Sequence, residues 1–124
     1  MFSEIFLDHF KNPRNVGELA APAITVQVEN PACGDILRLS VDWRNGTISD
    51  TRYKVRGCTA SIAAGSALAE WLAGKTLGEA RSLTAGMIEE AVGGLSPESK
   101  HAAVLCVDAV RRLVSVYTQI SALS

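Results

Sequence analysis

The feature that most constrains this fold is a pair of strand-like segments joined by Asn45-Gly46. Apolar and polar side chains alternate from Asp35 to Trp43, as expected of a strand with one buried face. A second segment with strand chemistry runs from Thr47 to Val55. Asn-Gly is the dipeptide most typical of a two-residue hairpin turn, because both residues tolerate positive φ. The sequence therefore predicts an antiparallel hairpin.

A further alternating segment precedes this hairpin. From Ala23 to Glu29, β-branched and polar residues alternate in ITVQVE, which is typical of a strand. A turn at Pro31 to Gly34 would reverse the chain and complete an antiparallel meander. In a meander this turn and the C-terminal end of the third strand lie at the same end of the sheet. Cys33, Asp35 and Cys58 are therefore expected to lie together at that end.

The other segments carry helix signals. Ser3, Thr76 and Thr84 are suitable N-cap residues, and Gly74 is a suitable helix stop. Helices are expected over Ser3–Phe10, Thr59–Gly74, Thr76–Ala80, Thr84–Val92 and Pro97–Ile120. The expected fold class is α+β, a three-stranded antiparallel sheet packed by helices. No linker or repeat interrupts the chain, so a single domain over residues 1–124 is expected.

Charge and composition exclude several classes of function. The chain has 12 basic and 13 acidic residues, a net charge of −1, and no basic block that would follow a phosphate backbone. Nucleic acid is therefore not an expected partner. No apolar run reaches the roughly 18 residues of a membrane span, and we expect a cytoplasmic protein without membrane contact. Cysteines kept reduced there favour metal or sulfur chemistry over cross-links.

Cys33 and Cys58 are the main candidates for such chemistry. Cys33 lies in NPACGD, where Gly34 lets a bound group approach the backbone, and we interpret this thiol as a ligand rather than a core residue. Asp35 alone would complete an Asx-type turn, but beside Cys33 we favour a role in ligation or proton handling. Cys58 lies at the start of the helix that follows it, where unpaired backbone N–H groups and the helix dipole favour a thiolate over a thiol.

His101 and Cys106 belong to the last expected helix. A lone helical His is more often a surface or core residue than a ligand, so His101 is a weaker candidate than the two thiols. Cys106 falls in the apolar stripe, where we favour core packing, with a ligand role as the alternative. Five residues correspond to about 140° of rotation, so His101 and Cys106 cannot readily bind one ion from a regular helix. His9 is assigned no chemistry.

Together, Cys33, Asp35, Cys58 and His101 would supply two sulfurs, one oxygen and one nitrogen. This donor set suits tetrahedral zinc or an iron site. Iron–sulfur clusters usually have thiolate ligands, and another type of ligand makes the cluster more labile. Such lability suits a protein that passes clusters on.

The motifs resemble those of the U-type iron–sulfur cluster assembly scaffolds, the IscU-like proteins and the N-terminal domain of NifU. LDHFKNPRNVG, from Leu7 to Gly17, is similar to the N-terminal signature of the family. NPACGDILRL is similar to its first Cys motif, and the segment from Val55 to Ala80 to its second Cys motif and following helix. The match spans nearly the whole chain and implies the α+β fold expected above.

The resemblance also implies what the site binds. In the family, the residues that match Cys33, Asp35, Cys58 and His101 bind zinc or a nascent [2Fe-2S] cluster. The implied function is a scaffold, not an enzyme, that takes iron from a donor and sulfur from a cysteine desulfurase. Acceptor apo-proteins then receive the transient cluster.

Two parts of the chain depart from the family pattern. Ala102 stands where the family has a third Cys, the acceptor of persulfide sulfur, and Cys106 follows about 6 Å further along the axis. Cys106 would replace that thiol only if the first helical turn unwinds or shifts. The family segment LPPVK, which an Hsp70-type chaperone recognises, reads LSPES from Leu95 to Ser99, so this partner is not favoured.

Two alternatives to the scaffold remain open. A zinc-binding sulfur acceptor or transferase is one, although its relatives keep the third Cys and have a longer segment than Thr76 to Gly94 before the last helix. The other is a degenerate module that binds and regulates a desulfurase without building clusters. The missing third Cys is the main argument for it.

Overall fold

The sheet is the antiparallel meander that the sequence predicts. The structure, a computed structural model, describes residues 3–32 and 34–123. The strands are β1 (Ile24–Glu29), β2 (Ile36–Arg44) and β3 (Thr47–Arg56), in the order β1-β2-β3. Asn45 and Gly46 have φ angles of 54° and 80°, as the predicted hairpin turn requires.

Short helices and one long helix complete the fold. Their bounds are α1 (Glu4–Lys11), α2 (Thr59–Leu72), α3 (Leu77–Arg81), α4 (Ala85–Ala91) and α5 (His101–Leu123), with a 3-10 helix at Pro97–Ser99. The hydroxyl groups of Ser3, Thr76 and Thr84 each accept a hydrogen bond from a backbone N–H three residues on, which confirms the predicted N-caps. Within the described ranges, no helix is long and apolar enough to cross a membrane.

The start of the last helix differs from the prediction. A 3-10 turn occupies Pro97–Ser99, and α5 begins only at His101. The Lys100 N–H donates to the carbonyl of Pro97, three residues back, which is the hydrogen-bond pattern of a 3-10 helix. His101 is therefore the first residue of α5 rather than a residue inside a longer helix.

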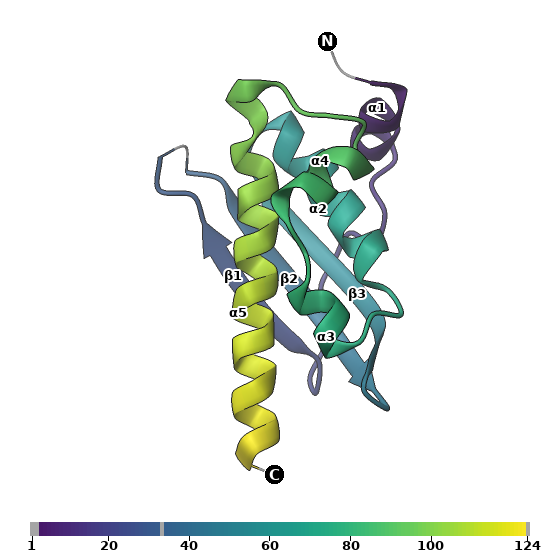
Figure 1. The fold of residues 1–124 in the computed structure, drawn as a ribbon, viewed down its shortest axis with the longest axis vertical. Coiled ribbons are helices and arrows are strands. Elements are labelled where there is room, and N and C mark those ends of the chain that lie inside the picture. The colour runs from purple at the N-terminus through teal and green to yellow at the C-terminus, as the bar shows by residue number, and fades with distance from the viewer. Residues whose placement is uncertain (1–2, 33, 124) are drawn as a thin grey trace.

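The helices α2 and α5 cover one face of the sheet. Figure 1 shows α5 crossing the strands at the centre of the molecule, and it contacts β1 and β2, whereas α2 contacts β3. Leu37, Leu39 and Val41 of β2 point into this layer and are at most 1% exposed. A Cβ at Gly65 would lie 2.6 Å from the Tyr53 ring, so the bare glycine lets α2 approach β3.

The candidate ligands lie together at one end of the strands. Glu29 pairs with Ile36, and Ile36 with Arg56, at the ends of the two ladders. Asp35 immediately precedes β2, and Cys58 follows β3 by two residues. Both residues therefore lie at the same end of the sheet, as the meander predicts.

Candidate metal centre

Asp35 is fixed by the turn that joins β1 to β2. The N–H of Gly34 donates to the Asn30 carbonyl over 2.7 Å, and the N–H of Asn30 donates to the Asp35 carbonyl over 2.8 Å. Gly34 has a φ of 76°, which favours glycine. Asp35 leaves this turn only 5% exposed. Its carboxylate is thus directed inward from the end of the sheet.

Gly57 makes room for this carboxylate. A Cβ built at Gly57 would lie 2.5 Å from the Asp35 Cγ and Oδ1 atoms, closer than real Cβ atoms approach. Any larger residue would therefore displace the Asp35 side chain. Gly57 is not among the residues predicted from the sequence, although its place directly before Cys58 is a usable signal.

Cys58 is the N-cap residue of α2 and is exposed. Its side chain makes no capping hydrogen bond to the helix. Instead, its Sγ atom lies 3.3 Å from the Asp35 Oδ2 atom, to which it donates. The thiol is therefore open to solvent while it faces a buried carboxylate.

His101 reaches the same point from the first turn of α5. Its Nδ1 atom lies 3.0 Å from the Glu98 carbonyl, which can only accept a hydrogen bond, so the proton is on Nδ1. This leaves Nε2 directed at the site, 3.4 Å from the Cys58 Sγ atom and 3.3 Å from the Asp35 Oδ2 atom. A histidine held through one nitrogen presents the other as a ligand.

The three ligand atoms form a nearly equilateral triangle with sides of 3.3 to 3.4 Å. In tetrahedral coordination with bonds of about 2.0–2.3 Å, neighbouring ligand atoms are about 3.3–3.8 Å apart. The triangle therefore has the size of one face of a tetrahedral site. Among the described residues, Asp35, Cys58 and His101 are the group of metal-ligating type whose donor atoms all lie within 4.8 Å of one another.

Ser61 supports the site from α2. Its hydroxyl donates to the Asp35 Oδ2 atom over 2.6 Å and lies 3.5 Å from the Cys58 Sγ atom. Ser61 is 2% exposed, so its partners are protein groups. Sequence reasoning missed this residue, because a Ser in an Ala-rich helix carries no metal-site signal of its own.

The pKa of Asp35 lies below its ordinary value. Burial by itself raises this pKa, because a low dielectric disfavours the anion. Hydrogen bonds from Ser61 and Cys58 outweigh that effect, and His101 adds a smaller one in the same direction when its imidazole is protonated. The carboxylate is therefore ionised near neutral pH and available as a hard anionic ligand.

The other predicted candidates lie elsewhere. Cys33 lies outside the described residues. Cys106 is 1% exposed within the core, and burial raises the pKa of its thiol to about 12. Ala102, at the position of the third family Cys, is fully buried. Among the described residues, Cys58 therefore carries the exposed thiol of this site.

The sequence and the fold of this chain are similar to those of known proteins. The model of the NifU-like N-terminal domain family matches residues 1–123. The chain is 40% identical over 120 residues to the iron-sulfur cluster assembly scaffold protein IscU of Azotobacter vinelandii, covering 94% of this chain and 93% of that protein. For IscU 1 of Archaeoglobus fulgidus the identity is 38% over 117 residues, with 94% and 76% covered. A solved NifU-like N-terminal structure from Brucella abortus has a TM-score of 0.59 at 26% identity, with 90% and 78% covered.

Proposed function

The chain belongs to the family of NifU-like N-terminal domains, and on that premise we propose that it is a scaffold for iron–sulfur cluster assembly. Iron and sulfur, or a nascent [2Fe-2S] cluster, are its cargo, and apo-proteins receive that cargo. Relatives that the chain matches over most of its length are named as such scaffolds. In this role the protein holds and transfers a group rather than acting as an enzyme.

The observation that carries this proposal is the triangle of Asp35, Cys58 and His101. It combines a buried, hydrogen-bonded carboxylate with an exposed thiol, so one side of the site is anchored and the other is open. A cargo site needs both properties, since the group must be held and then released. Thiolates are the usual ligands of iron–sulfur clusters, and oxygen or nitrogen ligands make a cluster more labile. The mixed ligands of this site therefore suit release of the cluster. Cys33 is proposed as a further ligand from its sequence motif alone.

We propose that sulfur arrives from a cysteine desulfurase at Cys58. The Cys58 thiolate attacks the outer sulfur of the desulfurase persulfide. A sulfur–sulfur bond forms at Cys58, the bond within the desulfurase persulfide breaks, and the desulfurase cysteine leaves as a thiolate. Ala102 has no thiol and Cys106 is buried, which supports Cys58 as the acceptor among the described residues.

Anaerobic reconstitution tests the proposal. The chain is incubated with ferrous iron, L-cysteine, a cysteine desulfurase and dithiothreitol, which reduces the transferred sulfur. Visible absorption and metal analysis then compare wild type with Cys58→Ala, His101→Ala and Cys106→Ala. We expect a [2Fe-2S] spectrum in wild type and in Cys106→Ala, and a greatly reduced spectrum in the other two variants.

Other outcomes of the reconstitution would change the assignment. Loss of the spectrum only in Cys106→Ala would mean that α5 rearranges and that Cys106 is a ligand. If no sample forms a cluster and the purified chain holds one zinc ion, the function to assign is that of a zinc-binding sulfur acceptor and not that of a scaffold. The sides of the triangle also fit zinc, which is why metal analysis accompanies the spectra. Desulfurase binding without either metal would indicate the regulatory module.

A further inference from the structure

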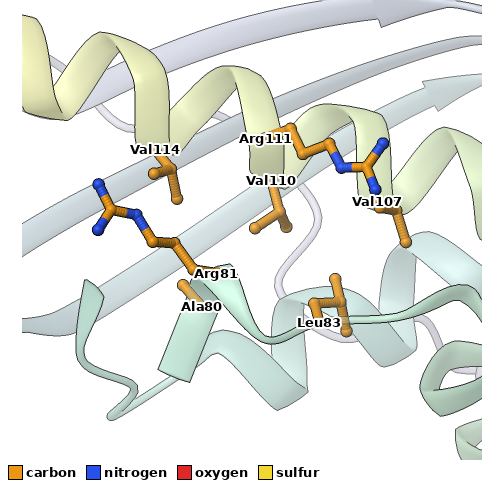
Figure 2. A pocket seen from close by; sticks show the side chains of 7 residues that line it. All are labelled: Ala80, Arg81, Leu83, Val107, Val110, Arg111 and Val114. Carbon is orange, nitrogen blue, oxygen red and sulfur yellow. The ribbon is translucent and has the colours of Figure 1, made fainter. Parts of the chain in front are cut away.

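A groove runs along the side of α5 that faces α3 and the start of α4. Two adjoining hollows of about 120 and 280 Å³ share Leu83, Val107 and Arg111 in their walls. One wall is α5, and the other is the segment from α3 to the start of α4. Figure 2 shows Leu83 facing Val107 and Val110 across this space.

The groove has an apolar floor. Val107, Val110 and Val114 of α5 are 7%, 2% and 8% exposed, and Val104 at one end is 50% exposed. These valines recur at intervals of three or four residues, so they form one stripe on the helix. From Val104 to Val114 the stripe is about 15 Å long, the length of about ten helical residues. The floor is therefore long enough to receive a segment of another polypeptide.

Two arginines border this floor without a carboxylate partner. In the described part of the chain, Arg111 has no side-chain hydrogen bond or ion pair, and Arg81 has only a contact of 3.5 Å with the Thr118 hydroxyl. By contrast, Arg14 and Arg38 pair with carboxylates of the same chain. Figure 2 shows these two guanidinium groups toward opposite ends of the hollow, with Val110 between them.

The acidic groups near the groove do not neutralise these arginines. The hollow that contains both arginines has no acidic residue in its lining. Asp108 and Arg111 both line the other hollow, but Asp108 makes no ion pair among the described residues. The end of the groove near Arg81 and Arg111 is thus apolar and positively charged, in a chain whose net charge is −1.

We propose that this groove docks an acidic, amphipathic segment of a partner protein. Apolar side chains of that segment would cover the valine stripe, and its Asp or Glu residues would pair with Arg81 and Arg111. Such a helix in a groove is a common mode of peptide recognition. The groove begins at Val104, three residues after His101 on α5. The docking surface does not depend on the proposed function.

A designed peptide tests the docking surface. It has 14 residues and blocked ends, with Leu at positions i, i+4, i+7 and i+11 and Glu at the flanking positions. Two matched peptides replace every Glu by Lys, or every Leu by Ala. Calorimetry with the full, metal-free chain measures Kd at about 0.15 M salt, where exposed charges act only over roughly 8 Å. Amide chemical shifts locate the site of binding.

Of the three peptides, we expect only the acidic one with Leu to bind. It should change the amide chemical shifts of residues from Val104 to Val114. Arg81→Glu with Arg111→Glu should weaken binding by about ten-fold or more, because attraction becomes repulsion at both ends. The matched control is Arg112→Glu, an exposed residue of α5 outside the groove, which should change Kd by less than about two-fold.

Three outcomes of the peptide titrations would overturn the proposal. One is no binding of the acidic peptide, and another is equal binding of the Lys peptide. The third is an Arg112→Glu effect as large as that of the double variant, since the attraction would then be nonspecific. Sedimentation of the free chain provides a further check. Self-association that the double variant abolishes would assign the groove to a second copy of this chain instead.

Discussion

At the scale of single residues, the position of the Asp35 carboxylate depends on two small neighbours. Gly57 leaves the volume that the carboxylate fills, and Ser61 donates to its Oδ2 atom over 2.6 Å. Neither residue has an atom suited to be a principal metal ligand. Their effect on metal affinity would therefore act through the orientation of Asp35.

Replacing Gly57 by Ala is expected to weaken metal binding. The new Cβ would lie 2.5 Å from the Asp35 Cγ atom, so the carboxylate must turn away from Cys58 and His101. Loss of such support typically lowers metal affinity by about 10–100-fold. Titration of the metal-free protein with Co²⁺, followed by thiolate-to-cobalt absorption, measures the affinity. Gly78→Ala is the matched control, because nothing lies within 4 Å of its Cβ position.

Replacing Ser61 by Ala is expected to weaken Co²⁺ binding by about ten-fold, in the range typical of groups that orient a ligand. The Asp35 carboxylate loses its shortest hydrogen bond and gains freedom to rotate. Ser66→Ala makes the same change in the same helix, but the Ser66 hydroxyl contacts His9 instead of the site. Equal cobalt affinities in the two variants would exclude the role assigned to Ser61.

At the scale of elements, a buried polar contact joins α1 to α2. The Nδ1 atom of His9 lies 2.8 Å from the Ser66 Oγ atom, and this Oγ atom accepts a hydrogen bond from the Arg14 N–H. The Arg14 guanidinium also lies 3.2 Å from the His9 Nδ1 atom. Nδ1 is therefore an acceptor, and His9 is neutral in this arrangement.

Acid is expected to weaken this contact. Burial lowers the pKa of His9, and the charge of Arg14 lowers it further, against smaller opposite effects of Glu70 and Asp8. The unfolded chain then binds a proton more readily than the folded chain as pH falls below about 6.5, so the free energy of unfolding decreases there. This contribution to stability is fully present only above that pH.

Urea denaturation of wild type and His9→Asn at about pH 7.5 and pH 5.5 checks this expectation, because the two values bracket the ordinary His pKa. The Asn oxygen approximates the position of Nδ1 as an acceptor and does not titrate. Wild type should lose more stability between the two pH values than His9→Asn does. An identical loss in both proteins would show that His9 does not control the acid sensitivity.

At the scale of the whole molecule, the site joins parts of the chain that are distant in sequence. Asp35, Cys58 and His101 come from the turn before β2, the N-terminus of α2 and the N-terminus of α5. A metal ion bound by all three would cross-link this end of the sheet to α2 and α5. The unfolded chain has no such preformed site, so binding must favour the folded state.

Zinc is therefore expected to stabilise the metal-free protein. At a free concentration of about 100 times Kd, the gain is about 2.7 kcal/mol. Thermal unfolding with zinc, and again after excess EDTA, should show a rise in Tm that the chelator reverses. In Cys58→Ala with His101→Ala the rise should disappear. A rise of equal size in that double variant would place the zinc elsewhere.

Much of the fold was predictable because local chemistry specifies it. Asn45-Gly46 favours one turn geometry, and Thr76 and Thr84 satisfy N–H groups only three residues away. The start of α5 was predicted too early, because Pro97 fits the first turn of either a 3-10 or an α-helix. The competition between these two helices is decided by contacts beyond the local sequence.

The meander, the caps and the position of Asp35 and Cys58 at the same end of the sheet could be predicted from the sequence, because these features depend on alternation, turn chemistry and strand order. The packing of the helices on the sheet is what brings His101 into the triangle, places Gly57 and Ser61 against Asp35 and leaves a groove beside α5. Cys58 and His101 are 43 residues apart, and their contact depends on how α5 packs across the sheet. Such packing is a property of the whole core, and no local pattern encodes it.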